Sequence, residues 1–340
     1  MVTFWNIFLR TFAIIVSVIT TIILGALLLN FIDTKNKEEF LFITGDKNSP
    51  NTIAIVELNG LIIESNNEFS DLTNPFLISP LQIQKHLDYL KIISPKVIIF
   101  SINSPGGTVS ASKNFYDIVK SFKKNNNTDI FFHTNEILTS GGYWASTSGD
   151  GIYASYGSII GSIGVKGPDW FFYDQPKSIS TGIFGNRIET IEGIKIFSSK
   201  AGKSKDIFNP FRKPKNYELD HLQNRVDEIY EDFVRVVSKE RKIEKNTIIN
   251  DVGALIYTSK KAIKLHLIDD EISLQNLINN IIKEKIFENY KIIKINNQKN
   301  SILRKILTNN YFSASDDIKN ECLSLRSSIS SILSYQSIGC

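Results

Sequence analysis

The run VIIFSINSPGG, residues 97–107, is the stretch that sets the fold class. Its first six residues are apolar apart from one serine, a pattern typical of a strand buried in a sheet. The strand then runs into a Pro-Gly-Gly turn. The same reading predicts further strands at residues 53–58, 130–133 and 152–154, and helices at residues 81–90 and 110–122. Strands that alternate with helices predict an α/β domain.

A second helical pattern lies further along the chain. Apolar residues recur at steps of three or four from Leu219 to Val236. This spacing places them on one face of a helix, so we expect one long amphipathic helix packed on the sheet.

Composition narrows the classes of partner. The chain has 340 residues, of which 42% are hydrophobic and 22% charged, a balance typical of globular proteins. The formal net charge of +4 comes from charges spread along the chain, which argues against a nucleic acid partner. Two cysteines, Cys322 and Cys340, and four scattered histidines offer no metal-ligand spacing, so we expect neither a metal nor another cofactor.

The amino terminus has a different composition. Residues 12–32, FAIIVSVITTIILGALLLNFI, are almost wholly apolar and long enough to cross a bilayer as a helix. The run lacks the small-residue site of a cleavable signal peptide, which favours a retained anchor. Positive charges flank both ends, so their count does not give the orientation. The predicted organisation is an anchor at 1–34, a linker at 35–50, a catalytic domain at 51–295 and a polar tail at 296–340.

Two glycine pairs follow predicted strands. Gly106 and Gly107 are able to present backbone N–H groups to a carbonyl oxygen, because glycine permits unusual dihedral angles and close approach. Ser140 precedes Gly141 at the expected start of a helix, where the helix dipole and the N–H of Gly141 favour a developing oxyanion. The alternative is that Ser140 caps the helix and the glycines form ordinary turns. Taken singly, each motif favours that alternative.

Other chemistry-bearing patterns are incomplete. The Gly-Lys-Ser at residues 202–204 would end a phosphate-binding loop, but Phe197 stands where its first glycine is required. A hydrolase elbow around Ser140 would need glycine in place of Leu138. The S-x-x-K pattern at residues 110–113 lacks its companion motifs. His133 has no evident carboxylate partner for a triad, so a structural histidine is favoured.

Several motifs together resemble one family. SINSPGG (residues 101–107), SGGYWAS (140–146) and GSIIGSIGV (157–165) are similar to the signature segments of the signal peptide peptidase A (SppA) family. That family consists of membrane-anchored bacterial serine–lysine peptidases, and the resemblance covers residues 50–295, in the shorter, single-domain form. The family's lysine segment, G-x-x-K-[DS], is matched by GKSKD at residues 202–206, which puts Lys205 at the position of the general base.

The resemblance implies a crotonase/Clp-protease-like fold of repeated strand-strand-helix units. It also implies a serine endopeptidase with Ser140 as nucleophile, Lys205 as general base, and an oxyanion hole of backbone N–H groups from Gly107, Gly141 and Gly106. The implied substrates are signal peptide remnants and other short hydrophobic peptides. The implied assembly is a homo-oligomeric ring with sites shared between protomers. The implied location is the bacterial inner membrane, with the catalytic domain outside the cytoplasm.

Two rival functions come from other classes. A catalytically silent membrane scaffold that binds peptides would be expected to lack the serine or the lysine, and both are present. A crotonase-type acyl-CoA enzyme would use the paired N–H groups on a thioester enolate, but the anchor and the pairing of Ser140 with Lys205 oppose it.

Some positions depart from the family pattern. Lys205 follows Ser140 at a longer spacing than short members lead us to expect, and the intervening residues 167–173 are unusually aromatic. Lys200 and Lys203 could favour a neutral amine at Lys205 by charge repulsion, or could be solvated surface charges.

Overall fold

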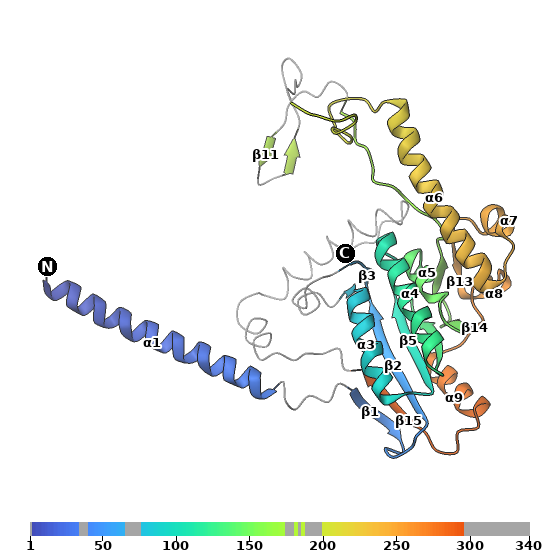
Figure 1. Cartoon of the computed structure of the whole chain (residues 1–340), viewed down its shortest axis with the longest axis horizontal. Coiled ribbons are helices and arrows are strands. Elements are labelled where there is room, and N and C mark those ends of the chain that lie inside the picture. Colours follow the sequence, from blue (N-terminus) through green and yellow to red (C-terminus); the bar gives the residue numbers. More distant parts are fainter. Residues whose placement is uncertain are drawn as a thin grey trace. The chain divides into compact units, whose positions relative to one another are not determined.

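The computed structural model describes residues 2–33, 40–64, 76–173, 180–182, 185–187 and 199–295 (Figure 1). The chain divides into two compact units, one made of Met1–Ile160 with Tyr257–Cys340 and the other of Gly161–Ile256. The predicted tail at residues 296–340, with both cysteines, lies outside the described residues.

A seven-stranded sheet forms the centre of the first unit, in the order β1-β15-β2-β5-β6-β8-β14. Neighbouring strands are parallel except for β1, which pairs antiparallel with β15. The predicted α/β class is confirmed. The strands of this sheet are β1 (Phe40–Gly45), β2 (Thr52–Asn59), β5 (Val97–Asn103), β6 (Asp129–Thr134), β8 (Gly151–Ala154), β14 (Asp270–Glu271) and β15 (Lys291–Ile295).

Smaller sheets and short helices complete this unit. Strands β3 (Leu61–Ile62) and β4 (Leu77–Ile78) form a parallel pair, and a three-stranded sheet has the order β13-β9-β7. The remaining elements are β7 (Ile137–Thr139), β9 (Ile159–Gly161), β13 (Ile256–Thr258), α5 (Gly141–Ser146) and α8 (Ser259–Lys264).

Helices cover both faces of the large sheet (Figure 1). On one face Phe115 of α4 (Val109–Asn125) packs against Phe100 and Phe132, with ring centroids 5.9 and 6.2 Å apart. Helix α3 (Pro80–Ile93) contacts α4. On the other face α9 (Leu274–Glu284) packs its apolar side against β2, β5 and β15. Because β5 is buried on both faces, its sequence is apolar at nearly every position rather than alternating.

The amino-terminal helix α1 spans Val2–Asp33. Within it, Phe4–Gly25 is long and apolar enough to cross a membrane, a finding that rests on length and composition. The side chains of residues 4–24 are exposed, so no part of the described protein covers them. The apolar helix is therefore confirmed, although its membrane-compatible segment begins earlier than the predicted residue 12.

The second unit is built around helix α6 (Asn216–Arg241), which confirms the predicted long helix. Its carboxyl-terminal half is buried at Phe233 and Val237, whereas Leu219 in the first turns is 44% exposed. Because α6 and the sheet belong to different units, the packing of α6 on the sheet stays a prediction. The other elements are the hairpin β11 (Ser180–Gly182) with β12 (Gly185–Arg187), α7 (Lys245–Thr247) and a π-helical turn, η1 (Ile248–Val252).

Candidate active site

Ser140 occupies a strained turn between strand β7 and helix α5. Its φ of 51° and ψ of −126° lie outside the left-handed helical region that Ser94, at 50° and 57°, adopts. Such a backbone costs about 1–3 kcal/mol for a residue other than glycine and persists only where its surroundings enforce it. The Ser140 side chain makes no helix-capping hydrogen bond and is half-buried. The backbone of Ser140 is thus held in an unusual conformation, and its hydroxyl group does not cap the helix.

Backbone pairing joins this turn to the end of β5. The N–H of Ser104 donates to the carbonyl of Ile137 over 2.8 Å, and the N–H of Thr139 donates to the carbonyl of Ser104 over 3.1 Å. The Thr139 hydroxyl also donates to the carbonyl of Pro105 over 3.1 Å. The Pro-Gly-Gly turn and the serine therefore lie side by side, although Gly107 and Ser140 are 33 positions apart in the sequence.

The glycines allow a close approach to Ser140. Gly106 has a φ of 111°, and a Cβ atom added there would lie 2.8 Å from the Cβ of Ser140 and 3.2 Å from its Oγ. A Cβ added at Gly141 would lie 2.1 Å from Oγ of Ser112 and 3.4 Å from the backbone nitrogen of Gly107. A side chain at Gly106 would thus collide with Ser140 itself, whereas one at Gly141 would collide with Ser112 of α4.

Two backbone donors are available beside the serine. The N–H of Gly106 donates to Oγ of Ser104 over 3.2 Å and is already engaged. In the part of the chain that the structure describes, the N–H groups of Gly107 and Gly141 have no such partner. Paired free N–H groups next to a hydroxyl are the arrangement that stabilises the oxyanion of an acyl-transfer reaction.

The substitution Gly106→Ala is expected to lower activity by about 100-fold or more, because the added methyl group displaces the Ser140 side chain and its neighbouring donor. The matched control is Gly157→Ala. Gly157 also has a positive φ, of 82°, but a Cβ added there meets nothing within 4 Å. Rates of peptide cleavage and thermal unfolding of both variants check this. Equal activity losses in the two would show that backbone strain, not the contact with Ser140, is responsible.

Lys205 lies in the second unit, so the structure does not place it relative to Ser140. It belongs to a series of turns between Gly202 and Phe208 that precedes α6, and it is exposed. Of the predicted site residues, the structure brings together Ser140 and the three glycines.

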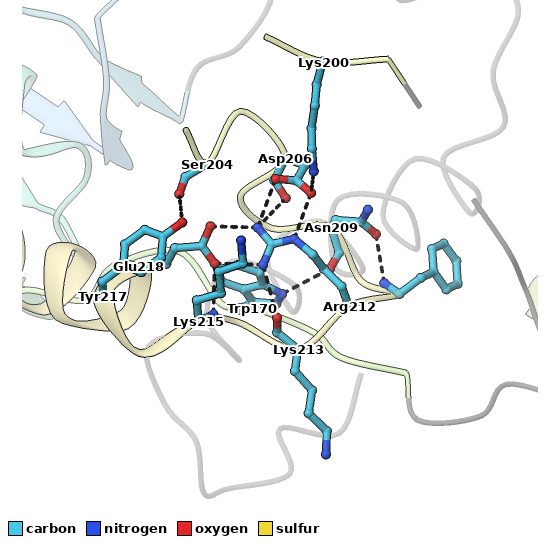
Figure 2. A network of polar contacts seen from close by, with 11 residues as sticks. Trp170, Lys200, Ser204, Asp206, Asn209, Arg212, Lys213, Lys215, Tyr217 and Glu218 are labelled. Atoms are coloured by element: carbon cyan, nitrogen blue, oxygen red, sulfur yellow. Dashed lines mark hydrogen bonds and ion pairs between the residues drawn. The ribbon is translucent and has the colours of Figure 1, made fainter. Parts of the chain in front are cut away.

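A network of polar contacts surrounds the Lys205 turn (Figure 2). Arg212 donates to the carboxylate of Glu218 through two nitrogens, each over 2.8 Å. It also donates to Asp206, over 2.9 Å from Nε and 3.2 Å from Nη2. Lys200 forms an ion pair with the same Asp206 carboxylate. These contacts connect the segment that carries Lys205 to the first turn of α6.

Lys200 and Lys203 each have a partner of their own. Lys200 is paired with Asp206, and the ammonium group of Lys203 lies 4.1 Å from the ring centroid of Tyr217. Neither is therefore simply a solvated surface charge.

The network depends on two ionised carboxylates. Hydrogen bonds from Arg212 lower the pKa of Glu218 from its ordinary 4.5 to about 2. Hydrogen bonds from Lys200 and then Arg212 lower the pKa of Asp206. A carboxylate whose pKa is depressed by folding stabilises the fold above its unfolded value and loses that contribution as the pH falls through the folded value.

We expect the Lys205 turn to stay protected from amide hydrogen exchange at pH 5 and to lose protection progressively between about pH 4.5 and pH 2, as Glu218 takes up a proton. Strand β5, which contains no carboxylate, serves as the internal reference. If the protection of residues 203–212 changes with pH in the same way as the protection of β5, the carboxylates have no stabilising role in this turn.

His133 is not arranged as a catalytic base. It is fully buried on β6, and its Nε2 lies 2.9 Å from the carbonyl oxygen of Ile272. Burial lowers its pKa. Its Nδ1 has no partner among the described residues, so the expected structural histidine is only partly satisfied. No group of three or more His, Cys, Asp or Glu side chains within the described ranges is arranged to hold a metal ion.

Two supporting residues were not singled out by the sequence patterns. The side-chain oxygen of Asn103 accepts hydrogen bonds from the Thr134 hydroxyl and from the N–H groups of Asn135 and Glu136, over 3.0 to 3.1 Å. Asn103 thereby shapes the turn that leads into β7. Arg212 is the other supporting residue. It lies six residues before Glu218, and this spacing indicates a contact only once α6 is known to begin between the two residues.

The sequence of this chain is similar to those of known peptidases. Residues 123–287 match Peptidase family S49, a range that includes Ser140 and Lys205. A candidate protease of Methanocaldococcus jannaschii is 32% identical to this chain, over a segment that covers 54% of this chain and 54% of the relative's length. A candidate signal peptide peptidase SppA of Enterococcus faecium is 27% identical over 72% of this chain and 67% of its own. Protease 4 of Haemophilus influenzae is 27% identical over 68% of this chain and 34% of its own. The chain thus spans between about one third and two thirds of the length of these relatives.

Two solved structures have a remote similarity to this chain. A variant of the 1510-N membrane-bound stomatin-specific protease gives a TM-score of 0.40 at 13% identity, over 67% of this chain and 84% of that one. A ClpP1 variant from Listeria monocytogenes gives a TM-score of 0.40 at 13% identity, over 65% of this chain and 92% of that one. Likeness at this level does not bear on activity. The match of residues 123–287 to Peptidase family S49 agrees with the resemblance carried by the sequence motifs.

Proposed function

We propose that this chain is a membrane-anchored serine endopeptidase in which Ser140 is the nucleophile and Lys205 the general base. The observation that carries the proposal is the backbone of Ser140, which is held at a φ of 51° and a ψ of −126° with its side chain uncapped. Strained residues of this kind cluster at functional sites. The S49 match and the protease names of the relatives support the same reaction class.

The proposed reaction proceeds through an acyl-enzyme. The neutral amine of Lys205 accepts the proton of the Ser140 hydroxyl as its oxygen attacks the peptide carbonyl carbon. The negative charge on the former carbonyl oxygen is stabilised by the N–H groups of Gly107 and Gly141. The protonated lysine then donates its proton to the leaving amine, and the carbon–nitrogen bond breaks. Water, deprotonated by the same lysine, hydrolyses the ester and regenerates Ser140.

The proposed substrates and location rest on the family resemblance. Remnant signal peptides and other short hydrophobic peptides are the proposed substrates, because α1 would keep the catalytic units at a membrane surface. The proposed location is a bacterial inner membrane with the catalytic units outside the cytoplasm. This orientation is tested with a reporter enzyme that works only in the cytoplasm, fused to the carboxyl terminus. Activity of that reporter would overturn the orientation.

Incubation of the full chain, purified in detergent, with a set of hydrophobic peptides and separately with an acyl-CoA tests the function. The proposal expects cleavage of peptides, no turnover of the acyl-CoA, and no effect of a metal chelator. Peptide binding without cleavage would favour the alternative of a catalytically silent scaffold. Turnover of the acyl-CoA alone would favour a crotonase-type enzyme.

A further inference from the structure

The residues on either side of Lys205 have partners in or just before helix α6: Ser204 contacts Tyr217 of the helix, and Asp206 contacts Arg212, which lies four residues before it (Figure 2). The Ser204 hydroxyl lies 2.9 Å from the hydroxyl of Tyr217, and the Asp206 carboxylate accepts two hydrogen bonds from Arg212. Ser204 has a φ of 60°, so the turn bends sharply just before the lysine. The backbone of Lys205 is thus fixed from both sides, while its own side chain is exposed.

Arg212 joins Asp206 to Glu218 in the first turn of α6. Its planar guanidinium group forms a two-pronged pair with Glu218, a geometry that lysine does not reproduce. The Glu218 side chain is only 1% exposed and also accepts a hydrogen bond from the backbone N–H of Lys215. The guanidinium carbon lies 5.1 Å from the ring centroid of Trp170, which supports the arginine on one face. Arg212 is therefore anchored to α6 and able to hold Asp206 against it.

We propose that Arg212 is a positioning residue for the general base. It fixes the turn that carries Lys205 to helix α6, and it occupies the Asp206 carboxylate so that this group does not pair with the neighbouring Lys205 amine. The inference rests on the proposed function, in which the amine of Lys205 must be neutral to accept a proton.

The second part of this role is electrostatic. The titratable and charged groups that face the turn, from the loop and from α6, are Lys200, Lys203, Asp206, Arg212, Lys215, Tyr217 and Glu218. Without Arg212, Asp206 loses its two-pronged partner and keeps only Lys200, which contacts one of its two carboxylate oxygens. The other oxygen then becomes available to the adjacent ammonium group of Lys205. A nearby opposite charge favours the charged form of an amine, so the neutral form would require a higher pH.

The test is the pH dependence of kcat and KM for three variants of the full chain. Arg212→Gln is expected to lower kcat at neutral pH by about 10- to 100-fold, with little change in KM, and to move the acidic limb of the profile to higher pH. Arg212→Lys should recover part of kcat, because it keeps the charge but not the two-pronged geometry. The matched control is Arg235→Gln, which breaks an exposed pair with Asp232 on the same helix and should leave kcat and its pH profile unchanged.

The double variant Arg212→Gln/Asp206→Asn separates position from charge. Removing the carboxylate as well should return the acidic limb to its original pH, while part of the loss in kcat remains. A uniform loss at every pH in Arg212→Gln, unaltered by Asp206→Asn, would overturn the proposed charge effect. If Arg212→Gln leaves Glu218 unpaired and fails to fold, the same comparison is made with Arg212→Lys.

Including Lys205→Ala in the series tests the positioning role of Arg212 separately from the assignment of Lys205 as the general base. Wild-type activity of Arg212→Gln together with an inactive Lys205→Ala would refute the positioning role and leave the proposed function standing. An active Lys205→Ala would refute the assignment of the base itself.

Discussion

Replacing Ser140 by alanine is expected to lower peptide cleavage by at least about 10³-fold, to the level of background hydrolysis. The reason is that only the hydroxyl oxygen is removed, and that oxygen is the atom that would form the bond to the substrate. The backbone turn, the glycine donors and the anchoring of α5 through the Tyr143 hydroxyl, which donates to the carbonyl of Leu267 over 2.8 Å, do not depend on it. Steady-state rates with a hydrophobic peptide measure the effect.

The control for this prediction is Ser148→Ala. Ser148 is a buried serine just past the other end of α5, and its hydroxyl donates to the carbonyl of Ala145 over 2.6 Å. Its loss should cost stability of the order of one hydrogen bond, about 1 kcal/mol, and little activity. A Ser140→Ala variant that folds and still cleaves above background would remove Ser140 as the nucleophile.

Replacing Lys205 by alanine is expected to lower activity by about 10²- to 10⁴-fold, the usual contribution of a general acid–base group. Lys203→Ala should keep most activity, because Lys203 is not assigned the proton transfer. Lys200→Ala should also keep most activity, because Arg212 still holds the Asp206 carboxylate in that variant. In the wild type, activity should rise with pH as the base becomes neutral, and this rise should disappear in Lys205→Ala. An indispensable Lys203 beside a dispensable Lys205 would show that the family's lysine segment has been aligned wrongly.

Mixing the two inactive chains tests whether each site is shared. The proposed ring lets the lysine of one protomer serve the serine of its neighbour. In a randomly mixed ring of Ser140→Ala and Lys205→Ala chains, about a quarter of the sites would then hold both groups. Sites built within one chain would leave every site incomplete, so verified mixed oligomers without activity would reject sharing and leave the serine–lysine chemistry untouched.

Four of the seven strands of the central sheet were predictable, because they are short, largely apolar runs. Strands β2, β5, β6 and β8 lie within one residue of the predicted ends. Helices α3 and α4 each extend three residues past their predicted ends, where Lys91 and the pair Lys123 and Lys124 interrupt the apolar period without breaking the helix.

Other features depend on contacts between distant segments. Strand β1 lies within the stretch assigned to the linker and pairs with β15, about 250 residues away, which no local pattern reports. The motifs singled out Ser140, but they do not report its strained backbone or the pairing of Ser104 with Ile137 and Thr139 beside it. The contacts of Arg212 likewise require the start of α6 to be known, because Asp206 and Glu218 lie six residues to either side of it.

The most direct test of the central claim is intact-mass spectrometry after treatment with a serine-directed fluorophosphonate, followed by peptide mapping of the adduct. Only a serine activated by a neighbouring base and positioned for attack reacts readily with such a reagent. We expect a single adduct per labelled chain on Ser140, absent from Ser140→Ala and formed far more slowly in Lys205→Ala. An adduct on another residue of the active protein, or full peptide cleavage by a protein that takes up no label, would contradict the assignment of Ser140 as nucleophile.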